Sequence, residues 1–219
     1  ALMSRLVAFG CSNTYGEGLE DCWILSPSGS NMRDGPNPSK FAWPMVLANI
    51  MDLECVNLSV PAASNKWICN KMLDTKLSNT DTVVFMWSYF NRTCFFQDDN
   101  TYRRLMAQDI TNNNKSASDK KYTKRFYKQF STETDLLIET FMKINFAKLF
   151  LDTHGIKNYH FTCDNRLLQM APPVWNCANV TIPDGSKHNV DVALDNQHPG
   201  PMSHSIIASQ IHNYIQENQ

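Results

Sequence analysis

Long apolar runs and surplus charge are both scarce in this 219-residue sequence. No apolar stretch approaches the roughly 20 residues that a membrane-spanning helix needs. Twenty basic and twenty-one acidic residues leave a net charge of −1, which gives no general attraction to nucleic acid or to an anionic membrane. We therefore expect neither a membrane span nor a nucleic-acid partner.

Paired cysteines are also missing. The seven cysteines form no C-x-x-C pair, their number is odd, and several lie inside apolar stretches. A disulfide framework or a zinc site is therefore not expected, and a reducing compartment is. Four histidines form no ligand spacing with cysteine or acidic residues, so we expect no metal and no other cofactor; they are His154, His160, His188 and His212.

Strand-like and helix-like segments alternate along the chain. Predicted strands cover residues 5–10, 54–60, 82–88 and 157–163, and predicted helices cover residues 40–51, 64–77, 131–153 and 202–217. This alternation predicts an α/β protein whose parallel sheet is covered by helices on both faces. The length suits one domain over residues 1–219.

One polar segment, residues 92–130, interrupts the alternation and is interpreted as an insertion that overhangs the active site. Within it Tyr122, Phe126 and Phe130 recur every four residues, which predicts a helix packed on the body. The basic and aromatic run at 120–128 could contact a phosphate or an acidic sugar, or it could be the solvated face of that helix.

A serine follows the first predicted strand. Residues 9–16 read Phe-Gly-Cys-Ser-Asn-Thr-Tyr-Gly, so Ser12 stands two residues beyond Gly10, where the strand stops. In parallel α/β sheets ligands bind beyond the carboxyl ends of the strands. The Ser12 hydroxyl is therefore a candidate nucleophile, although the segment could also be an ordinary turn.

The C-terminal part of the chain offers an activating pair, Asp195 and His198, in Asp-Asn-Gln-His-Pro. A hydroxyl is a weak nucleophile until a base takes its proton, and an imidazole is a suitable base near pH 7. A carboxylate three residues earlier can fix the tautomer of the ring and stabilise its charged form. The alternative is a turn residue followed by a surface histidine.

Together the two segments resemble the motifs of the SGNH (GDSL-type) hydrolases. That family has a Gly-Asp-Ser-Asn-Thr-Tyr-Gly-like element after the first strand and an Asp-x-x-His-Pro element near the C-terminus, followed by a second histidine, here His204. The resemblance implies a three-layer α/β/α sandwich of the flavodoxin-like SGNH type. It also implies a catalytic triad of Ser12, His198 and Asp195.

The resemblance further implies an oxyanion site formed by the backbone N–H groups of Ser12 and Ala62 and the side-chain amide of Asn91. Ala62 stands where the family has glycine, and alanine retains the N–H group. Asn13 and Arg92 are the candidates for contact with the substrate, and Arg92 could instead hold the site together.

Cys11 departs from the family pattern, which has aspartate before the serine. It raises the alternative of a thiol nucleophile, although adjacent side chains in an extended turn point apart and a buried structural cysteine is the ordinary case. The α/β-hydrolase fold is disfavoured because its G-x-S-x-G element is missing.

The implied function is hydrolysis of acetyl or other short acyl esters, on a small ester or an acylated carbohydrate, through an acyl-enzyme. A thioesterase or lysophospholipase is the nearest enzymatic alternative, and a non-catalytic carbohydrate- or protein-binding module on the same fold is the other. Five tryptophans could stack on sugars or fill the core. We expect a cytoplasmic or virion-associated protein, since no signal region precedes the first strand.

Overall fold

The computed structural model describes residues 4–25, 32–99, 101–113, 115–170, 178–180 and 190–218. Its central sheet has the spatial order β4-β1-β5-β8-β9, and every neighbouring pair is parallel. The strands are β1 (Arg5–Phe9), β4 (Glu54–Asn57), β5 (Thr82–Trp87), β8 (Lys157–Thr162) and β9 (Ala178–Asn179). This is the flavodoxin-like order of a doubly wound fold.

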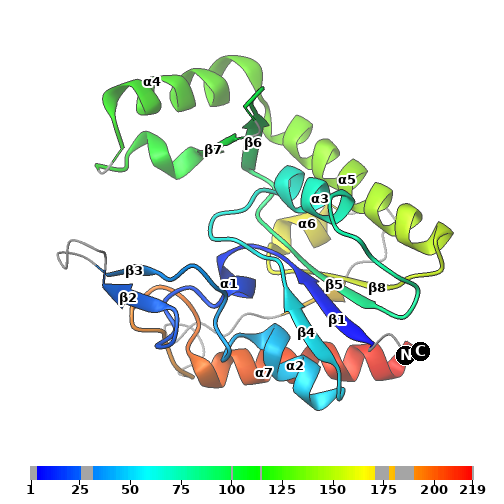
Figure 1. Cartoon of the computed structure of the whole chain (residues 1–219). Coiled ribbons are helices and arrows are strands. Elements are labelled where there is room, and N and C mark those ends of the chain that lie inside the picture. Colours follow the sequence, from blue (N-terminus) through cyan, green and yellow to red (C-terminus); the bar gives the residue numbers. More distant parts are fainter. Residues whose placement is uncertain are drawn as a thin grey trace.

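Helices cover both faces of this sheet, as predicted (Figure 1). On one face lie α2 (Trp43–Ile50) and α7 (Pro201–Glu217), and on the other lie α3 (Asn65–Leu73) and α5 (Glu133–Thr153). Strand β5 is buried along its whole length and serves both layers, because its side chains alternate between the faces. The three-layer α/β/α arrangement is thereby confirmed.

Local sequence signals explain where the long helices begin and end. The Ser64 hydroxyl accepts a hydrogen bond from the Trp67 N–H at 3.2 Å and caps α3, and Thr132 caps α5 in the same way. Pro44 lies in the first turn of α2, where a proline costs no hydrogen bond. Gly155 follows α5 with a φ of +65° and stops it.

Several short elements were not predicted. They include the single-turn helix α1 (Ser12–Tyr15), the antiparallel pair β2 (Trp23–Leu25) and β3 (Met32–Asp34), and helix α6 (Asn165–Gln169). These elements are too short for a hydrophobic period to develop. Residues 26–31, between β2 and β3 in the sequence, lie outside the described residues.

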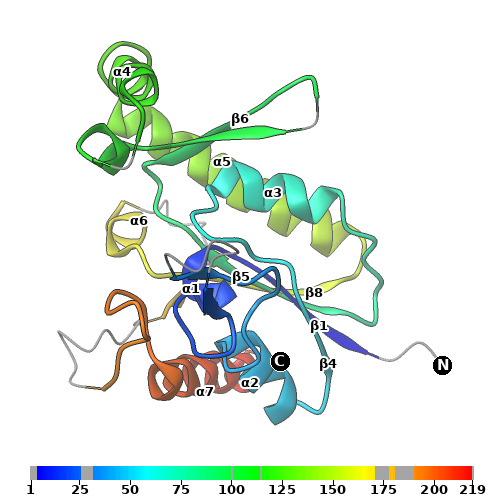
Figure 2. The ribbon, with the colours of Figure 1, turned by 60° about the vertical axis from the view of Figure 1, so that its left-hand side comes forward.

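The polar insertion forms an arm that stands away from the sandwich (Figures 1 and 2). It contains the antiparallel hairpin β6 (Arg92–Phe96) and β7 (Tyr102–Met106), the 3₁₀ helix η1 (Ala107–Ile110), α4 (Ala117–Arg125) and the π-helix η2 (Phe126–Phe130). The hairpin was not predicted, because neither strand alternates apolar and polar residues: β6 reads Arg-Thr-Cys-Phe-Phe and β7 reads Tyr-Arg-Arg-Leu-Met.

The helical prediction for the end of the insertion is right, but the predicted packing on the body is wrong for Tyr122 and Phe130, which are 43% and 66% exposed. A four-residue spacing determines which side chains share a face of a helix but not the direction of that face, and here both rings are exposed to solvent. Tyr127 makes the attachment instead. Its hydroxyl donates to the carbonyl oxygens of Asn91 at 2.6 Å and Leu105 at 3.0 Å.

Candidate active site

The candidate site lies at the carboxyl end of β1, between β4 and β5. In this strand order the chain leaves β1 toward one side of the sheet and later returns to the other, so a crevice opens there. Gly10 ends the strand, and a Cβ on it would lie 2.0 Å from Thr14 Oγ1. Only glycine therefore lets α1 fold back so tightly, and Ser12 opens that helix.

Ser12 presents its backbone N–H at the first position of α1. The first N–H groups of a helix have no intrahelical acceptor, and in the described part of the chain nothing accepts from Ser12 N–H. Cys11 supplies the helix with a carbonyl oxygen, which accepts from Thr14 and Tyr15 N–H at 2.9 Å. The Ser12 residue is 5% exposed.

Asp195 and His198 make the predicted contact. His198 Nδ1 and Asp195 Oδ2 are 2.5 Å apart, and Asp195 Oδ1 accepts the backbone N–H groups of Gln197 at 3.0 Å and His198 at 3.1 Å. Burial by itself would raise the pKa of Asp195, but these hydrogen bonds outweigh it and lower the pKa below its usual value. The ionised carboxylate fixes the ring with Nδ1 as the donor.

Gly18 fixes this loop against the turn that follows α1. Its φ is +82°, and a Cβ on it would lie 2.6 Å from Asp195 Cγ. The Gly18 carbonyl oxygen also accepts the Leu194 N–H at 2.9 Å. The segment near the C-terminus is thereby held beside the element that carries Ser12.

Glu17 occupies the other side of the imidazole. Its Oε2 lies 3.5 Å from His198 Nε2, and its backbone N–H donates to the Ser12 carbonyl oxygen at 3.1 Å. Among the described residues no hydrogen bond joins Ser12 Oγ to His198, so that contact of the triad stays a prediction. Sequence reasoning missed Glu17, although its place one turn beyond Ser12 was a usable signal.

The loop that was predicted to supply an oxyanion donor has a left-handed residue at its centre. Ala62 has a φ of +58°, a region in which a Cβ costs about 1–2 kcal/mol. This conformation accounts for the glycine in the family motif. Within the described residues nothing accepts the Ala62 N–H. Arg104 of β7 braces the loop by donating to the Pro61 carbonyl oxygen at 2.7 Å.

The loop after β5 is held by Asn65, the first residue of α3. Asn65 is 2% exposed; its amide donates to the Ser88 carbonyl oxygen at 2.9 Å and its Oδ1 accepts the Ser88 N–H at 2.7 Å. Arg92 donates to Ser88 Oγ at 3.2 Å, so it braces this loop. The side-chain amide of Asn91 makes no hydrogen bond among the described residues, and its oxyanion role stays a prediction.

Two thiols and a phenol lie at the same end of the sheet. Cys11 is fully buried in the core layer under α3 and α5. Burial, and then Cys11, raise the pKa of the Cys163 thiol to about 12, and Cys163 raises the pKa of Tyr89 to about 12. Asn13 is the other candidate for substrate contact, and its amide nitrogen lies 3.9 Å from Cys163 Sγ. A neutral or inaccessible thiol is a poor nucleophile, which favours Ser12 over Cys11.

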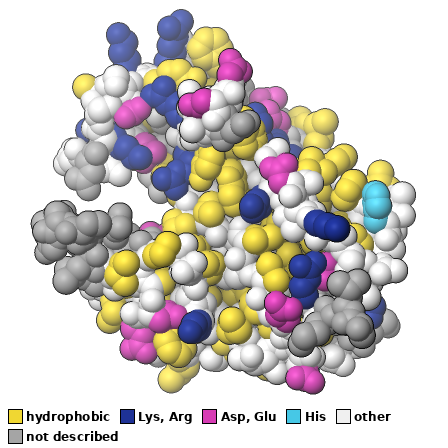
Figure 3. All heavy atoms as spheres, viewed as in Figure 1, with side chains coloured by type: hydrophobic (Ala, Val, Ile, Leu, Met, Phe, Trp, Pro, Cys, Tyr) yellow, Lys and Arg dark blue, Asp and Glu magenta, His cyan; other side chains and the backbone are white. Residues whose placement is uncertain are grey.

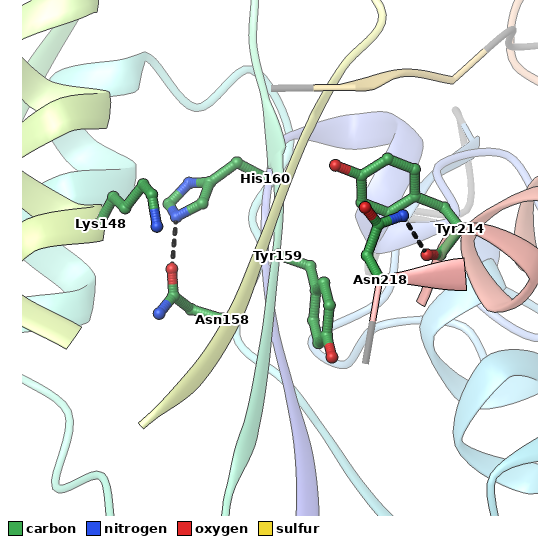
Figure 4. A pocket seen from close by; sticks show the side chains of 6 residues that line it. All are labelled: Lys148, Asn158, Tyr159, His160, Tyr214 and Asn218. Atoms are coloured by element: carbon green, nitrogen blue, oxygen red, sulfur yellow. Dashed lines mark hydrogen bonds between the residues drawn. The ribbon is translucent and has the colours of Figure 1, made fainter. Parts of the chain in front are cut away.

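A hollow of about 240 Å³ lies elsewhere, along the outer edge of β8 (Figure 4). Asn158 and His160 point to one face of the sheet and Tyr159 to the other, so the hollow wraps the strand edge. These residues lie toward the amino end of β8, whereas the candidate site lies at the carboxyl ends. This hollow is therefore separate from the candidate site.

Three further properties concern the described residues only. Their six cysteines are all unpaired, and Cys177 lies outside them. They contain no group of three or more His, Cys, Asp or Glu side chains arranged to hold a metal ion. Within them no helix has the length and apolar character needed to cross a membrane.

No protein-family model and no curated protein matches the sequence. Solved structures do match the fold. An acetyl xylan esterase from the rumen bacterium Butyrivibrio proteoclasticus aligns with 100% of this chain at 11% identity and a TM-score of 0.54. A carbohydrate esterase family 2 enzyme with a carbohydrate binding domain, from Corynascus thermopiles (Myceliophthora fergusii), aligns with 99% at 11% identity and a TM-score of 0.57.

This chain spans 65% and 66% of the lengths of those two proteins. It spans 97% of the psychrotrophic esterase EstA from Pseudoalteromonas sp., at 9% identity and a TM-score of 0.50. Lipolytic proteins of the G-D-S-L family match at similar values. The chain has the SGNH (GDSL-type) hydrolase fold, as its motifs predicted.

Proposed function

We propose that this protein is a serine ester hydrolase in which Ser12 is the nucleophile, His198 the general base and Asp195 the residue that orients the base. The proposal depends on the 2.5 Å contact between His198 Nδ1 and Asp195 Oδ2. Gly18, in the turn after α1, packs directly against the Asp195 carboxyl group. A carboxylate paired with one ring nitrogen leaves the other nitrogen to accept a proton.

In the proposed reaction Ser12 Oγ attacks the ester carbonyl carbon while His198 Nε2 takes the hydroxyl proton. Nε2 must first turn from Glu17 toward Ser12. Asp195 stays at Nδ1, and its carboxylate, together with that of the nearby Glu17, stabilises the positive ring that forms. The tetrahedral oxyanion would be held by the N–H groups of Ser12 and Ala62, and by the Asn91 amide.

Collapse of this intermediate breaks the bond to the alcohol, which leaves with the proton from His198. Water then attacks the acyl-enzyme, again with His198 as base, and releases the carboxylic acid and free Ser12. No cofactor or metal takes part in this scheme.

The proposed substrates are acetyl or short acyl esters on carbohydrate. Two structural neighbours are named as an acetyl xylan esterase and a carbohydrate esterase, which supports this class at the level of the fold. A thioesterase or lysophospholipase would use the same residues. Rates on acetylated xylan, an acyl thioester and a lysophospholipid would rank the three classes.

The second candidate function is a binding module that does not catalyse. The position of Glu17 at His198 Nε2, and the strained Ala62 in the oxyanion loop, favour it. Hydrolysis of p-nitrophenyl acetate by wild type, His198→Ala and His154→Ala separates the two, since His154 is an exposed histidine at the far end of α5. An esterase loses activity only in His198→Ala, whereas equal background rates in all three would favour the binding module.

A further inference from the structure

A second cleft lies between helix α3 and the tip of the β6–β7 hairpin. Its volume is about 530 Å³, which is in the range of sites for small ligands. Figure 2 shows the hairpin extending over α3, so that one wall belongs to the sandwich and the other to the insertion. In Figure 3 hydrophobic side chains are exposed between the Lys- and Arg-rich arm and the body of the molecule.

Three aromatic rings line this cleft. The Tyr102 ring lies between those of Trp67, at 6.1 Å between centroids, and Phe96, at 6.4 Å. The interplanar angles are 46° and 52°, so the rings do not cover one another face to face. Trp67 also packs against the core layer under α3, which fixes its position. Rigid aromatic faces of this kind are partners for the apolar C–H face of a ring-shaped ligand.

Amide groups stand beside the rings. The Asn70 amide nitrogen donates to Asp74 Oδ2 at 3.0 Å, which holds the amide in place and leaves its carbonyl oxygen as an acceptor. The Gln97 side chain lines the hairpin wall, and its amide carries two N–H donors and a carbonyl acceptor. The cleft therefore offers both donors and acceptors next to apolar faces.

The charges on the lining cancel. Lys71 and Asp74 are the ionisable side chains of the α3 wall, and they have opposite sign. This balance does not favour an anion or a cation. A neutral sugar ring matches the lining, because it has an apolar face and hydroxyl groups that donate and accept.

Both walls of the cleft belong to elements that connect to the proposed oxyanion loop. Ser64, the cap of α3, is two residues beyond Ala62, and Trp67 lies in the first turn of the helix. On the other wall Arg104 of β7 donates to the Pro61 carbonyl oxygen. From Trp67 to Asp74 the helix axis covers about 10 Å. The cleft therefore leads away from the site along α3.

We infer that this cleft binds neutral sugar units of a glycan chain at a distance from the ester under attack. The inference rests on the proposed function, which places the ester at Ser12. It gives the insertion the role of binding the glycan. Tyr102 is the central contact, Trp67 and Phe96 flank it, and Asn70 and Gln97 bind hydroxyl groups.

The test measures binding of neutral hexasaccharides of xylose, glucose and N-acetylglucosamine by calorimetry. Tyr102→Ala is compared with Tyr122→Ala, which removes an exposed tyrosine of the same arm outside the cleft. We expect at least one hexasaccharide to bind the wild type, Tyr102→Ala to weaken it tenfold or more, and Tyr122→Ala to change it less than twofold. Asn70→Ala, a milder change on a helix, should weaken binding several-fold.

Hydrolysis of p-nitrophenyl acetate serves as the second readout, because this small ester does not reach the cleft. We expect both tyrosine variants to retain the wild-type rate and to melt within a few degrees of it. The inference is overturned if none of the hexasaccharides binds, or if Tyr102→Ala binds like the wild type. The proposed function fails separately, when wild type and Ser12→Ala hydrolyse the small ester equally.

Discussion

At the scale of single residues, several backbone positions with positive φ shape the candidate site, and they include Asn196, which lies between Asp195 and His198. Gly18 packs against the loop that contains Asp195, and Ala62 lies at the centre of the proposed oxyanion loop. Glycine adopts this conformation freely, whereas alanine does so at a cost. Gly18 and Ala62 each yield a test that separates geometry from simple loss of stability.

Gly18→Ala should displace Asp195 and lower ester hydrolysis. The new Cβ would meet the Asp195 carboxyl group, and a misplacement of about 1 Å at a catalytic group can cost about a hundredfold in rate. Gly155→Ala is the matched control, because Gly155 also has a positive φ but has no atom within 4 Å of the added Cβ. In urea unfolding Gly155→Ala should lose about 1–2 kcal/mol of stability from the positive φ alone, and Gly18→Ala should lose more, because its Cβ also meets the Asp195 carboxyl group.

Only Gly18→Ala should lose activity on p-nitrophenyl acetate. Equal rates for the two variants would show that the position of Asp195 does not matter for hydrolysis.

Ala62→Gly should stabilise the protein. It relieves about 1–2 kcal/mol of backbone strain, and the greater flexibility of glycine stabilises the unfolded state by about 0.4–1 kcal/mol, so the expected net gain in stability lies between about 0 and about 1.6 kcal/mol. The rate of ester hydrolysis should not fall, since glycine retains the N–H group. The neighbouring Ala63 is fully buried and has no positive φ, so Ala63→Gly should destabilise. Urea unfolding of both variants checks the signs, and a destabilised Ala62→Gly would contradict the strain.

Residues with a local signature could be predicted from the sequence, and residues defined by tertiary contacts could not. Asp195 and His198 are three positions apart in a recognisable motif, and their contact is present. Glu17 and Asn65 were missed, because their partners lie 181 and 23 positions away along the chain. The roles of Ser12 and Asn91 stay predictions.

At the scale of elements, β8 and α7 each bury a neutral imidazole. His160 Nδ1 accepts from Trp87 Nε1 at 3.0 Å and its Nε2 lies 2.9 Å from Asn158 Oδ1. His204 Nδ1 accepts the Trp43 N–H at the start of α2, at 3.1 Å. Burial lowers the pKa of His160 to about 3 and that of His204 to about 4. The neutral rings therefore connect elements of the core.

Lowering the pH should destabilise the fold well before the carboxylates titrate. The unfolded chain takes up a proton on each of these histidines near pH 6.5, and the native state does not until about pH 3–4. The stabilisation is complete above pH 6.5 and falls by about 1.4 kcal/mol per pH unit and per histidine as the pH drops. From pH 7.5 to 5.0 each should cost about 2 kcal/mol.

Urea unfolding at the two pH values measures this loss. His160→Gln should be less stable at pH 7.5, because the ring stacks on Phe85 at 4.8 Å, but it should lose about 2 kcal/mol less than the wild type between the two values. A wild-type free energy of unfolding that is the same at both pH values would contradict buried neutral histidines.

The elements that could be predicted are those long enough to show a period. Helices α2, α3, α5 and α7 lie within the predicted ranges to within a few residues, since an apolar face repeats along each of them. The β6–β7 hairpin escaped because neither of its strands alternates apolar and polar residues. The sequence predicts a helix at residues 126–130, but a four-residue spacing does not distinguish a π-helical turn from an α-helical one.

At the scale of the whole molecule, the strand order explains how distant segments meet. Strand β1 lies between β4 and β5. Ser12, which follows β1, therefore lies at the topological switch point of the sheet, beside the loops that follow β4 and β5. Helix α7 returns across the same face as α2 and brings the Asp195 loop to the turn after α1. The fold class followed from the alternation of strands and helices, but this meeting depends on topology.

The insertion is attached at the end of the sheet where the candidate site lies. Arg104 and Tyr127 attach it to the loops after β4 and β5, which are the loops of the proposed oxyanion site. An arm anchored there is placed to hold the part of a substrate that extends beyond the reacting ester.

The most direct measurement is labelling with a fluorophosphonate probe, which reacts with activated serines, followed by peptide mass spectrometry. We expect one adduct, on Ser12, which is absent from Ser12→Ala, strongly reduced in His198→Ala and retained in Cys11→Ala. Equal labelling of wild type and Ser12→Ala, or an adduct on another serine alone, would contradict a serine hydrolase built on Ser12, His198 and Asp195.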